Sequence, residues 1–408
     1  MHYYRLFVQK YHRYLFFGFI LTFCSCLGQM FFISLFGGHF CQEIGLSYGE
    51  LGWIYSLTTL GSGFLLLWFA PKIEHYKVSY FTLLVLAMLI ASMFLLSQVK
   101  SWMAFFMVLL SLRFFSQSML GHIAMTTIAK IFPYHRGKAV GIISMGFSLG
   151  EALLPLIIVM LTNFLSWQEV WKVLAAFLAV IVVPSLLFLF KRIDLEGNIK
   201  HAPLLPNTMI ISPGDNSRLW TRSEVLKDKK FYLLLPALLS PTLILTGIFF
   251  AHIPLGAEKN WDLNWLAASF SIFALSNLFS CLYFGKKIDE KGCFFIMPYV
   301  LPLLSLGLFS LVFISDPIFS VMLYMFCAGM AVGGNRVVLN TIWVELYGME
   351  RLGEIRGMVV FICIVCASIS PSLFGHLLDR GVAMQSILAA SCVYVMLSML
   401  ALKWVKWH

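Results

Sequence analysis

Apolar runs of about 20 residues recur along the whole chain, separated by short polar stretches, and each is long enough to cross a bilayer as a helix. Twelve such runs are present. The first six are 14–37, 49–70, 79–98, 102–129, 139–162 and 170–190, and the second six are 231–256, 264–284, 293–314, 317–343, 356–378 and 382–402. The pattern predicts an all-α membrane protein with twelve transmembrane helices.

The only long polar stretch lies between the sixth and seventh runs, at 191–230, and is rich in Pro, Asn, Ser and charge. We expect it to be a cytosolic linker with one short amphipathic helix near Ser223–Lys230. It divides the chain into an N-terminal six-helix bundle, 1–190, and a C-terminal six-helix bundle, 231–408.

Composition supports a membrane rather than an aqueous environment. The chain is 60% hydrophobic and 12% charged, whereas soluble proteins are about 25% charged. The net charge of +10 does not indicate nucleic-acid binding, because Lys and Arg collect in the cytoplasmic loops of membrane proteins. The nine Cys are scattered through apolar runs without the His spacing of a zinc site, so we expect neither metal nor cofactor.

The distribution of Lys and Arg over the loops predicts the orientation. Twenty-three lie on one side of the twelve spans and three on the other. The positive-inside rule therefore places both termini and the linker in the cytoplasm of a multi-pass protein of the inner (plasma) membrane. The basic residues before the first apolar run resemble a signal peptide, but the run continues without a small-residue cleavage site, which favours a retained helix.

The two halves echo each other. After the second span stands APKIEHYK (70–77), and at the same place after the eighth stands GKKIDEKG (285–292). The fourth span contains GHIAMTT (121–127) where the tenth contains GNRVVLN (334–340). Two related six-helix halves joined by a linker are typical of secondary transporters.

These motifs resemble the major facilitator superfamily. The segment 285–292 fits that family's loop motif, Gly-x-x-x-Asp-x-x-Gly, whereas the copy at 70–77 departs from it, with Ala70, Glu74 and Lys77 in the motif positions. The glycine-rich fifth span and Arg113 in the fourth also match the family. The stretches GQMFFISLFGGHF (28–40) and GEALLP (150–155) are similar to a bacterial branch near the monocarboxylate and oxalate/formate carriers.

The resemblance implies two pseudo-symmetric bundles that expose a central site alternately to each side, and a monomer. It also implies a cytoplasmic gate in which a glycine ends the helix in a left-handed turn and an acid joins nearby bases. The gate residues expected here are Glu74, Gly285, Asp289 and Gly292. The alternative is a turn that merely carries positive-inside charge.

Two opposite charges fall near the bilayer midplane on consecutive spans. Arg113 lies roughly 16 Å below the start of the fourth span and Glu151 roughly 18 Å above the start of the fifth. Charges at this depth are costly and usually face a cavity or each other, so we expect Arg113 to be the partner of Glu151. The pair either fixes helix packing, or binds an anionic substrate at Arg113 and a proton at Glu151.

Further polar residues inside spans complete the candidate set for substrate or proton binding. Gln29 lies at mid-depth in the first span, and Asn277 lies in the eighth. Arg336 in the tenth span lies one residue beyond the position that corresponds to His122 in the fourth, and each of the two either lines the inner cavity or reaches the rim. His252 and His376, toward the outer side, are either proton relays or simply hydrated.

Glycines four residues apart predict close helix packing, in the pairs Gly137–Gly141, Gly146–Gly150 and Gly329–Gly333. Prolines inside spans predict kinks or breaks, at Pro155, Pro298, Pro302 and Pro371.

The function favoured by these features is secondary active transport of a small anionic or zwitterionic solute, coupled to protons or to exchange. The alternative is a multidrug or siderophore-type efflux carrier of the same fold. An ATP-driven pump is disfavoured because no Gly-x-x-x-x-Gly-Lys-Ser/Thr occurs, and an enzyme because no metal-ligand run occurs. The expected partners are the substrate and the bilayer, not nucleic acid.

Overall fold

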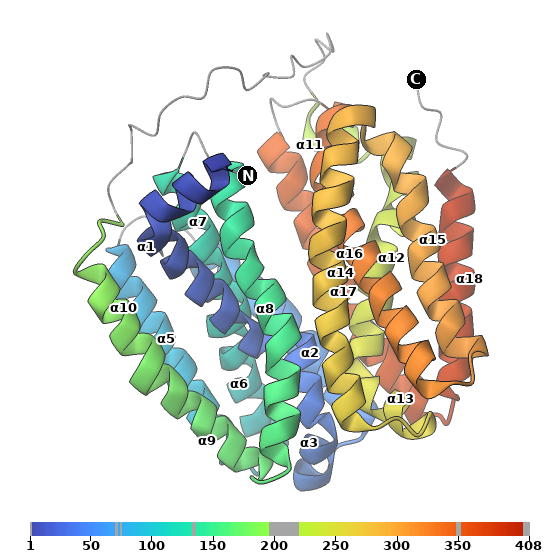
Figure 1. Cartoon of the computed structure of the whole chain (residues 1–408). Coiled ribbons are helices and arrows are strands. Elements are labelled where there is room, and N and C mark those ends of the chain that lie inside the picture. The colour runs from blue at the N-terminus through green and yellow to red at the C-terminus, as the bar shows by residue number, and fades with distance from the viewer. Residues whose placement is uncertain are drawn as a thin grey trace. The chain divides into compact units, whose positions relative to one another are not determined.

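The computed structural model describes residues 2–69, 72–73, 76–132, 136–195, 220–347 and 352–402, and these ranges contain helices and no strand (Figure 1). Within them, eleven helical stretches are long and apolar enough to cross a membrane, and the bent pair Leu6–Gly28 with Met30–Ile44 makes a twelfth if it is counted as one span. The predicted all-helical membrane fold is therefore confirmed.

The described residues group into two compact units. The first comprises Met1–Leu46 and Leu57–Pro206, and the second comprises Ser47–Ser56 and Asn207–His408. The start of the second span, which the predicted division assigned to the N-terminal bundle, thus groups with the second unit. Most of the predicted linker, 196–219, lies outside the described residues.

The helices of the first unit follow in chain order. They are α1 (His2–Ser25), η1 (Cys26–Gly28), α2 (Met30–Ile33), η2 (Ser34–Phe36), α3 (Gly37–Ile44), α4 (Tyr48–Phe69), α5 (Val78–Leu96), α6 (Trp102–Arg113), η4 (Phe114–Leu120), α7 (Gly121–Ile131), α8 (Arg136–Thr162), α9 (Trp167–Phe177), η6 (Leu178–Val182) and α10 (Val183–Phe190). Helices α6, η4 and α7 form one continuous span, as do α9, η6 and α10.

The second unit continues from there. Its helices are α11 (Arg222–Val225), α12 (Lys229–Phe250), α13 (His252–Glu258), α14 (Leu263–Lys291), α15 (Cys293–Phe313), α16 (Pro317–Tyr347), α17 (Leu352–Asp379) and α18 (Met384–Leu402). The amphipathic helix predicted near Ser223–Lys230 is only the single turn α11, because the N-cap Asp228 starts α12 directly after it.

Two of the three predicted glycine pairs lie in close helix contacts, whereas a methyl group at Gly141 would meet nothing within 4 Å, so the close packing predicted there is wrong. A methyl group at Gly146 of α8 would clash with the Phe19 carbonyl of α1, and one at Gly150 would clash with the Cys26 thiol of η1. Gly329 and Gly333 of α16 lie in the same way against α14. The four prolines lie inside helices that continue through them (α8, α15 and α17), so these helices are not broken at proline, and the predicted kinks stay a prediction.

Candidate functional site

The first span is broken at Gly28–Gln29, although it contains no proline. Gln29 has an extended backbone, with φ −80° and ψ 157°, and the segments on either side of it differ in direction by 52°. A methyl group on Gly28 would lie 2.9 Å from the Ser116 Cβ atom, so only glycine lets the break lie this close to the fourth span. A broken helix at this depth is tolerated where the backbone is buried in protein or lines a cavity.

The fourth span is also irregular at this level. Its segment η4 is a π-helix, a form that occurs frequently at functional sites. Arg113, the residue before η4, is 2% exposed, and its Nη1 donates a hydrogen bond to the Gly28 carbonyl at 3.3 Å. The Ser116 hydroxyl contacts the carbonyl oxygens of Cys24 and Ser25 at 3.0 and 3.1 Å. Arg113 and Ser116, at the start of the π-helix, therefore contact carbonyl oxygens of the first span at and just before the break.

Glu151 approaches the same break from α8. Gly150, its neighbour, lies directly against Cys26, and the Glu151 carboxylate interacts electrostatically with the Cys26 thiol. Glu151 is half-buried. The two charges selected from the sequence thus converge on one short stretch, Cys26–Gln29, from two different helices.

Two amides add hydrogen-bonding capacity next to this stretch. The Gln29 side chain is half-buried and has no hydrogen-bond partner within the described ranges. Gln117 follows Ser116 in η4, and its Oε1 atom is buried without a hydrogen-bond partner among the described residues. A guanidinium, a carboxylate and two amides around a broken helix are suited to hold a small polar or anionic molecule. We call Gln29, Arg113, Gln117 and Glu151 the break cluster.

His122 does not belong to the break cluster. It lies nine residues beyond Arg113 along the same span, roughly 13 Å away. Its ring nitrogens lie 3.5 Å from the Thr126 hydroxyl, one turn further along α7.

Arg336 and Asn277 belong to the second unit. Arg336 is exposed on α16, and its backbone carbonyl accepts a hydrogen bond from the Asn340 amide at 2.7 Å. Asn277 is 1% exposed, and its backbone lies against Gly329 and Gly333 where α14 packs on α16. These contacts put Asn277 in a helix–helix interface.

The predicted gate residues are placed only in part. Glu74 lies outside the described residues, as does the side chain of Asp289. Gly285 was expected in a loop after a span ending at residue 284, but α14 continues to Lys291. The helix ends instead at Gly292, which has φ +83°. Gly292 is followed directly by α15, whose first backbone N–H, that of Cys293, donates to Glu345 Oε1 at 2.8 Å.

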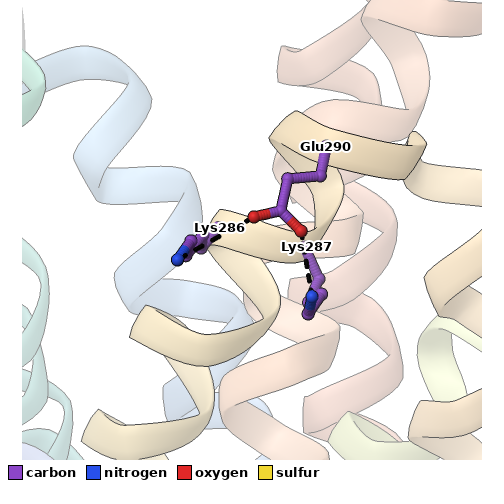
Figure 2. A network of polar contacts seen from close by, with 3 residues as sticks. All are labelled: Lys286, Lys287 and Glu290. Carbon is purple, nitrogen blue, oxygen red and sulfur yellow. Dashed lines mark hydrogen bonds and ion pairs between the residues drawn. The ribbon is translucent and has the colours of Figure 1, made fainter.

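Two charge pairs lie on the surface of the last turns of α14. Figure 2 shows the Glu290 carboxylate between two lysines of the preceding turn, with its oxygens 3.9 Å from Lys286 Nζ and 2.9 Å from Lys287 Nζ. Such pairs three and four residues apart stabilise a helix. The Lys287 hydrogen bond also lowers the pKa of Glu290.

A second buried polar group lies in the second unit, just past the end of α12. His252 is 1% exposed, and neither of its ring nitrogens has a hydrogen-bond partner among the described residues. Its ring contacts Phe249, Phe270 and Tyr324, with centroids 5.1, 5.3 and 6.0 Å apart. Burial lowers the pKa of His252 to about 3.

The other outer histidine, His376, is part of a hydrogen-bonded contact between the start of α4 and the end of α17. The Trp53 indole donates to His376 Nε2 at 3.1 Å. Asp379 accepts from the Ser47 hydroxyl at 2.7 Å and from the Gly49 backbone N–H at 2.8 Å. All of these residues belong to the second unit.

Sequence reasoning missed Ser116, Gln117 and both helix irregularities. The break had a weak signal, since Gly28 and Gln29 interrupt an apolar run, whereas nothing in the composition of residues 114–120 marks a π-helix. Within the described ranges, no group of three His, Cys, Asp or Glu lies close enough together to hold a metal ion.

Comparisons with known proteins agree with this architecture. The mouse protein monocarboxylate transporter 6 is 23% identical over 271 residues, which are 63% of this chain and 57% of that protein, so the match spans little more than half of the relative. Among solved structures, the nucleoside transporter NupG has a TM-score of 0.69 at 15% identity, covering 97% of this chain and 100% of that one. A bacterial homolog of the human lysosomal transporter Spinster has a TM-score of 0.67 at 12% identity, covering 98% and 97%.

At these identities the structural matches show the fold. The sequence profile of the Major Facilitator Superfamily, however, matches residues 18–371, nearly the whole chain. The relative and the structural neighbours are named as transporters and not as enzymes. The spans are those of a multi-pass membrane protein, and the chain belongs to the Major Facilitator Superfamily.

Proposed function

We propose that this transporter moves a small organic anion and that the break cluster is its binding centre. The observation that carries the proposal is the convergence of buried Arg113 and half-buried Glu151 on the broken stretch Cys26–Gln29. The similarity to a protein named a monocarboxylate transporter supports the substrate class.

Arg113 is suited to a carboxylate substrate. A guanidinium offers five N–H donors in a planar fork that matches a carboxylate. The bond from Nη1 to the Gly28 carbonyl, at 3.3 Å, is longer than the usual 2.7–2.9 Å of a charge-assisted bond. A substrate carboxylate can therefore replace a weak neutral acceptor with a charged one, while the Gln29 amide supplies a further donor.

Glu151 is suited to carry the coupling proton. It is the acidic member of the break cluster and is half-buried on α8, close to the Cys26 thiol. Protonation of Glu151 would make the cluster net positive and strengthen its attraction for an anion, whereas deprotonation would weaken it. Anion and proton would then travel together.

The orientation and assembly remain part of this proposal. The loop charges support cytoplasmic termini in the inner (plasma) membrane. A monomer made of bundles 1–190 and 231–408 joined by a cytosolic linker is the simplest arrangement consistent with the twelve spans.

The test begins with the purified protein and a thermal-shift screen over short mono- and dicarboxylates, amino acids and siderophore-like compounds. We expect a carboxylate to raise the melting temperature, and Arg113→Gln to weaken its binding by roughly 30-fold, as expected for loss of a charge-assisted bond of about 2 kcal/mol. The matched control is Lys172→Gln, an exposed cation on α9. Binding that survives Arg113→Gln would refute the proposed site, and stabilisation only by hydrophobic cations would favour the efflux alternative.

Coupling is tested with the same carboxylate in proteoliposomes. A pH step that makes the outside acidic relative to the lumen should drive accumulation by the wild type, because anion and proton move in the same direction, and the opposite step should not. Glu151→Gln should retain exchange but lose the response to the step. Glu43→Gln, which removes an exposed carboxylate, is the control. A normal response in Glu151→Gln would exclude the proton role and leave the anion site intact.

A further inference from the structure

A crevice in the first unit lies outside the break cluster and has no role in the proposed function. It is a cavity of about 320 Å³, within the size range of ligand pockets. It is formed where the end of α4 and the start of α5 meet η4. Its lining is apolar and aromatic except at one end, where Lys72 lies beside Tyr76 and Tyr80.

The crevice opens to the surface along α5. Tyr80, Leu84 and Met88 line it, and they are 63%, 42% and 46% exposed. They are spaced four residues apart, so they form one stripe on the helix, about 12 Å long. Exposed apolar side chains within a span face lipid rather than water. The long axis of the crevice therefore runs from the membrane interface toward the bilayer interior.

The polar end lies at the level of lipid headgroups. The spans on either side of it are Tyr48–Phe69 and Val78–Leu96, so Lys72 and Tyr76 lie in the connection just outside the apolar core. Tyrosines at this level are typical of membrane interfaces. Lys72 Nζ lies 4.2 Å from the centroid of the Phe69 ring, which holds the ammonium at the crevice mouth. Among the described residues, no carboxylate lies within salt-bridge distance of Lys72.

We propose that this crevice binds an anionic phospholipid, with an acyl chain along Leu84 and Met88 and the phosphate at Lys72. The charge of Lys72 complements the phosphate, and the lining complements the chain. The occupant is a membrane lipid rather than a free anion, because the apolar length of the crevice contributes nothing to binding a headgroup alone.

A lipid bound in the crevice would contact the π-helix through the inner wall. Phe114, Phe115 and Met119 form this wall, and all three belong to the π-helix η4. The Phe114 ring packs on Phe69, with centroids 5.4 Å apart. A chain in the crevice therefore contacts the same π-helix whose opposite side faces Gly28.

The experiment uses the full-length protein, stripped of lipid in detergent and examined by native mass spectrometry. Phosphatidylglycerol and phosphatidylcholine with identical chains are added separately. We expect phosphatidylglycerol to be retained about five-fold more than phosphatidylcholine, and Lys72→Gln to remove that difference, because one lysine near an anionic lipid contributes about that factor. Lys77→Gln, an exposed lysine that does not line the crevice, should retain the preference.

Two further measurements distinguish a bound lipid from a bound free anion. Leu84→Trp fills the apolar part and should lower retention of both lipids while Lys77→Gln does not. Glycerol 3-phosphate, which carries the anionic group without chains, should not displace the lipid. The proposal is overturned if Lys72→Gln and the wild type show the same preference for phosphatidylglycerol. It is also overturned if Lys77→Gln loses that preference as much as Lys72→Gln does, or if glycerol 3-phosphate displaces the lipid fully.

Discussion

Replacing His252 by phenylalanine should reduce the sensitivity of the second unit to acid. His252 is enclosed by Phe249, Phe270 and Tyr324. Tyr324 is the titratable member of this aromatic enclosure, and burial is the cause of the lowered pKa of His252. A phenyl ring has nearly the same shape and removes two nitrogens that have no hydrogen-bond partner within the described ranges.

The magnitude follows from proton linkage. Burial holds the pKa of His252 at about 3 in the folded protein, whereas an unfolded histidine titrates near 6.5. Between these values the unfolded chain binds more protons than the folded chain. The contribution of His252 is therefore complete above pH 6.5 and declines as the pH falls toward 3. At pH 5, which is 1.5 units below the unfolded value, the loss is about 2 kcal/mol at 1.36 kcal/mol per unit.

The assay is a melting curve of the purified protein in detergent between pH 8 and pH 5. A loss of about 2 kcal/mol corresponds to roughly 4–8 °C for a cooperative unit of this size. Between pH 8 and pH 5, the melting temperature of the wild type should fall by this amount more than the melting temperature of His252→Phe. His39→Gln, which removes an exposed histidine, should match the wild type. Parallel pH profiles for the wild type and His252→Phe would show that His252 is not held neutral by burial, and the reasoning would fail.

Two further predictions concern packing. Gly146→Ala should lower the melting temperature by the equivalent of about 1–3 kcal/mol, because its methyl group would meet the Phe19 carbonyl. Gly141→Ala on the same helix has open space and should be neutral or slightly stabilising. Equal effects of the two substitutions would contradict the close contact of α8 with α1. Asp379→Asn should lower the melting temperature more than Ser47→Ala, since the carboxylate accepts from both the Ser47 hydroxyl and the Gly49 N–H; if the order is reversed, Asp379 is not the centre of that contact.

The membrane spans could be predicted because bilayer thickness fixes their length. Helices such as α5, with bounds Val78–Leu96 against the predicted 79–98, are set by an apolar run alone. Helix ends outside the apolar runs were predicted less accurately. Helix α14 ends seven residues beyond the predicted 284, and the Glu290 pairs lie in this added part.

Three members of the break cluster, Gln29, Arg113 and Glu151, could be selected from the sequence, whereas Gln117 could not. Arg113 and Glu151 stand out in an apolar context, and simple depth arithmetic puts them at one level. The geometry that joins them is tertiary: Gly28 lies against Ser116, and Gly150 lies against Cys26. A break without proline and a π-helix both depend on the fit between two spans, which no single stretch of sequence encodes.

The bend in the first span has a practical consequence for measuring the transport cycle. Because Leu6–Gly28 and Met30–Ile44 meet at 52°, that span cannot be treated as one straight rod. A spectroscopic probe on Met30–Ile44 and another on Leu6–Gly28 would report displacements about a shared joint as well as those of the whole bundle. A single inter-probe distance that involves this span therefore underdetermines the motion, and labels on both arms are required.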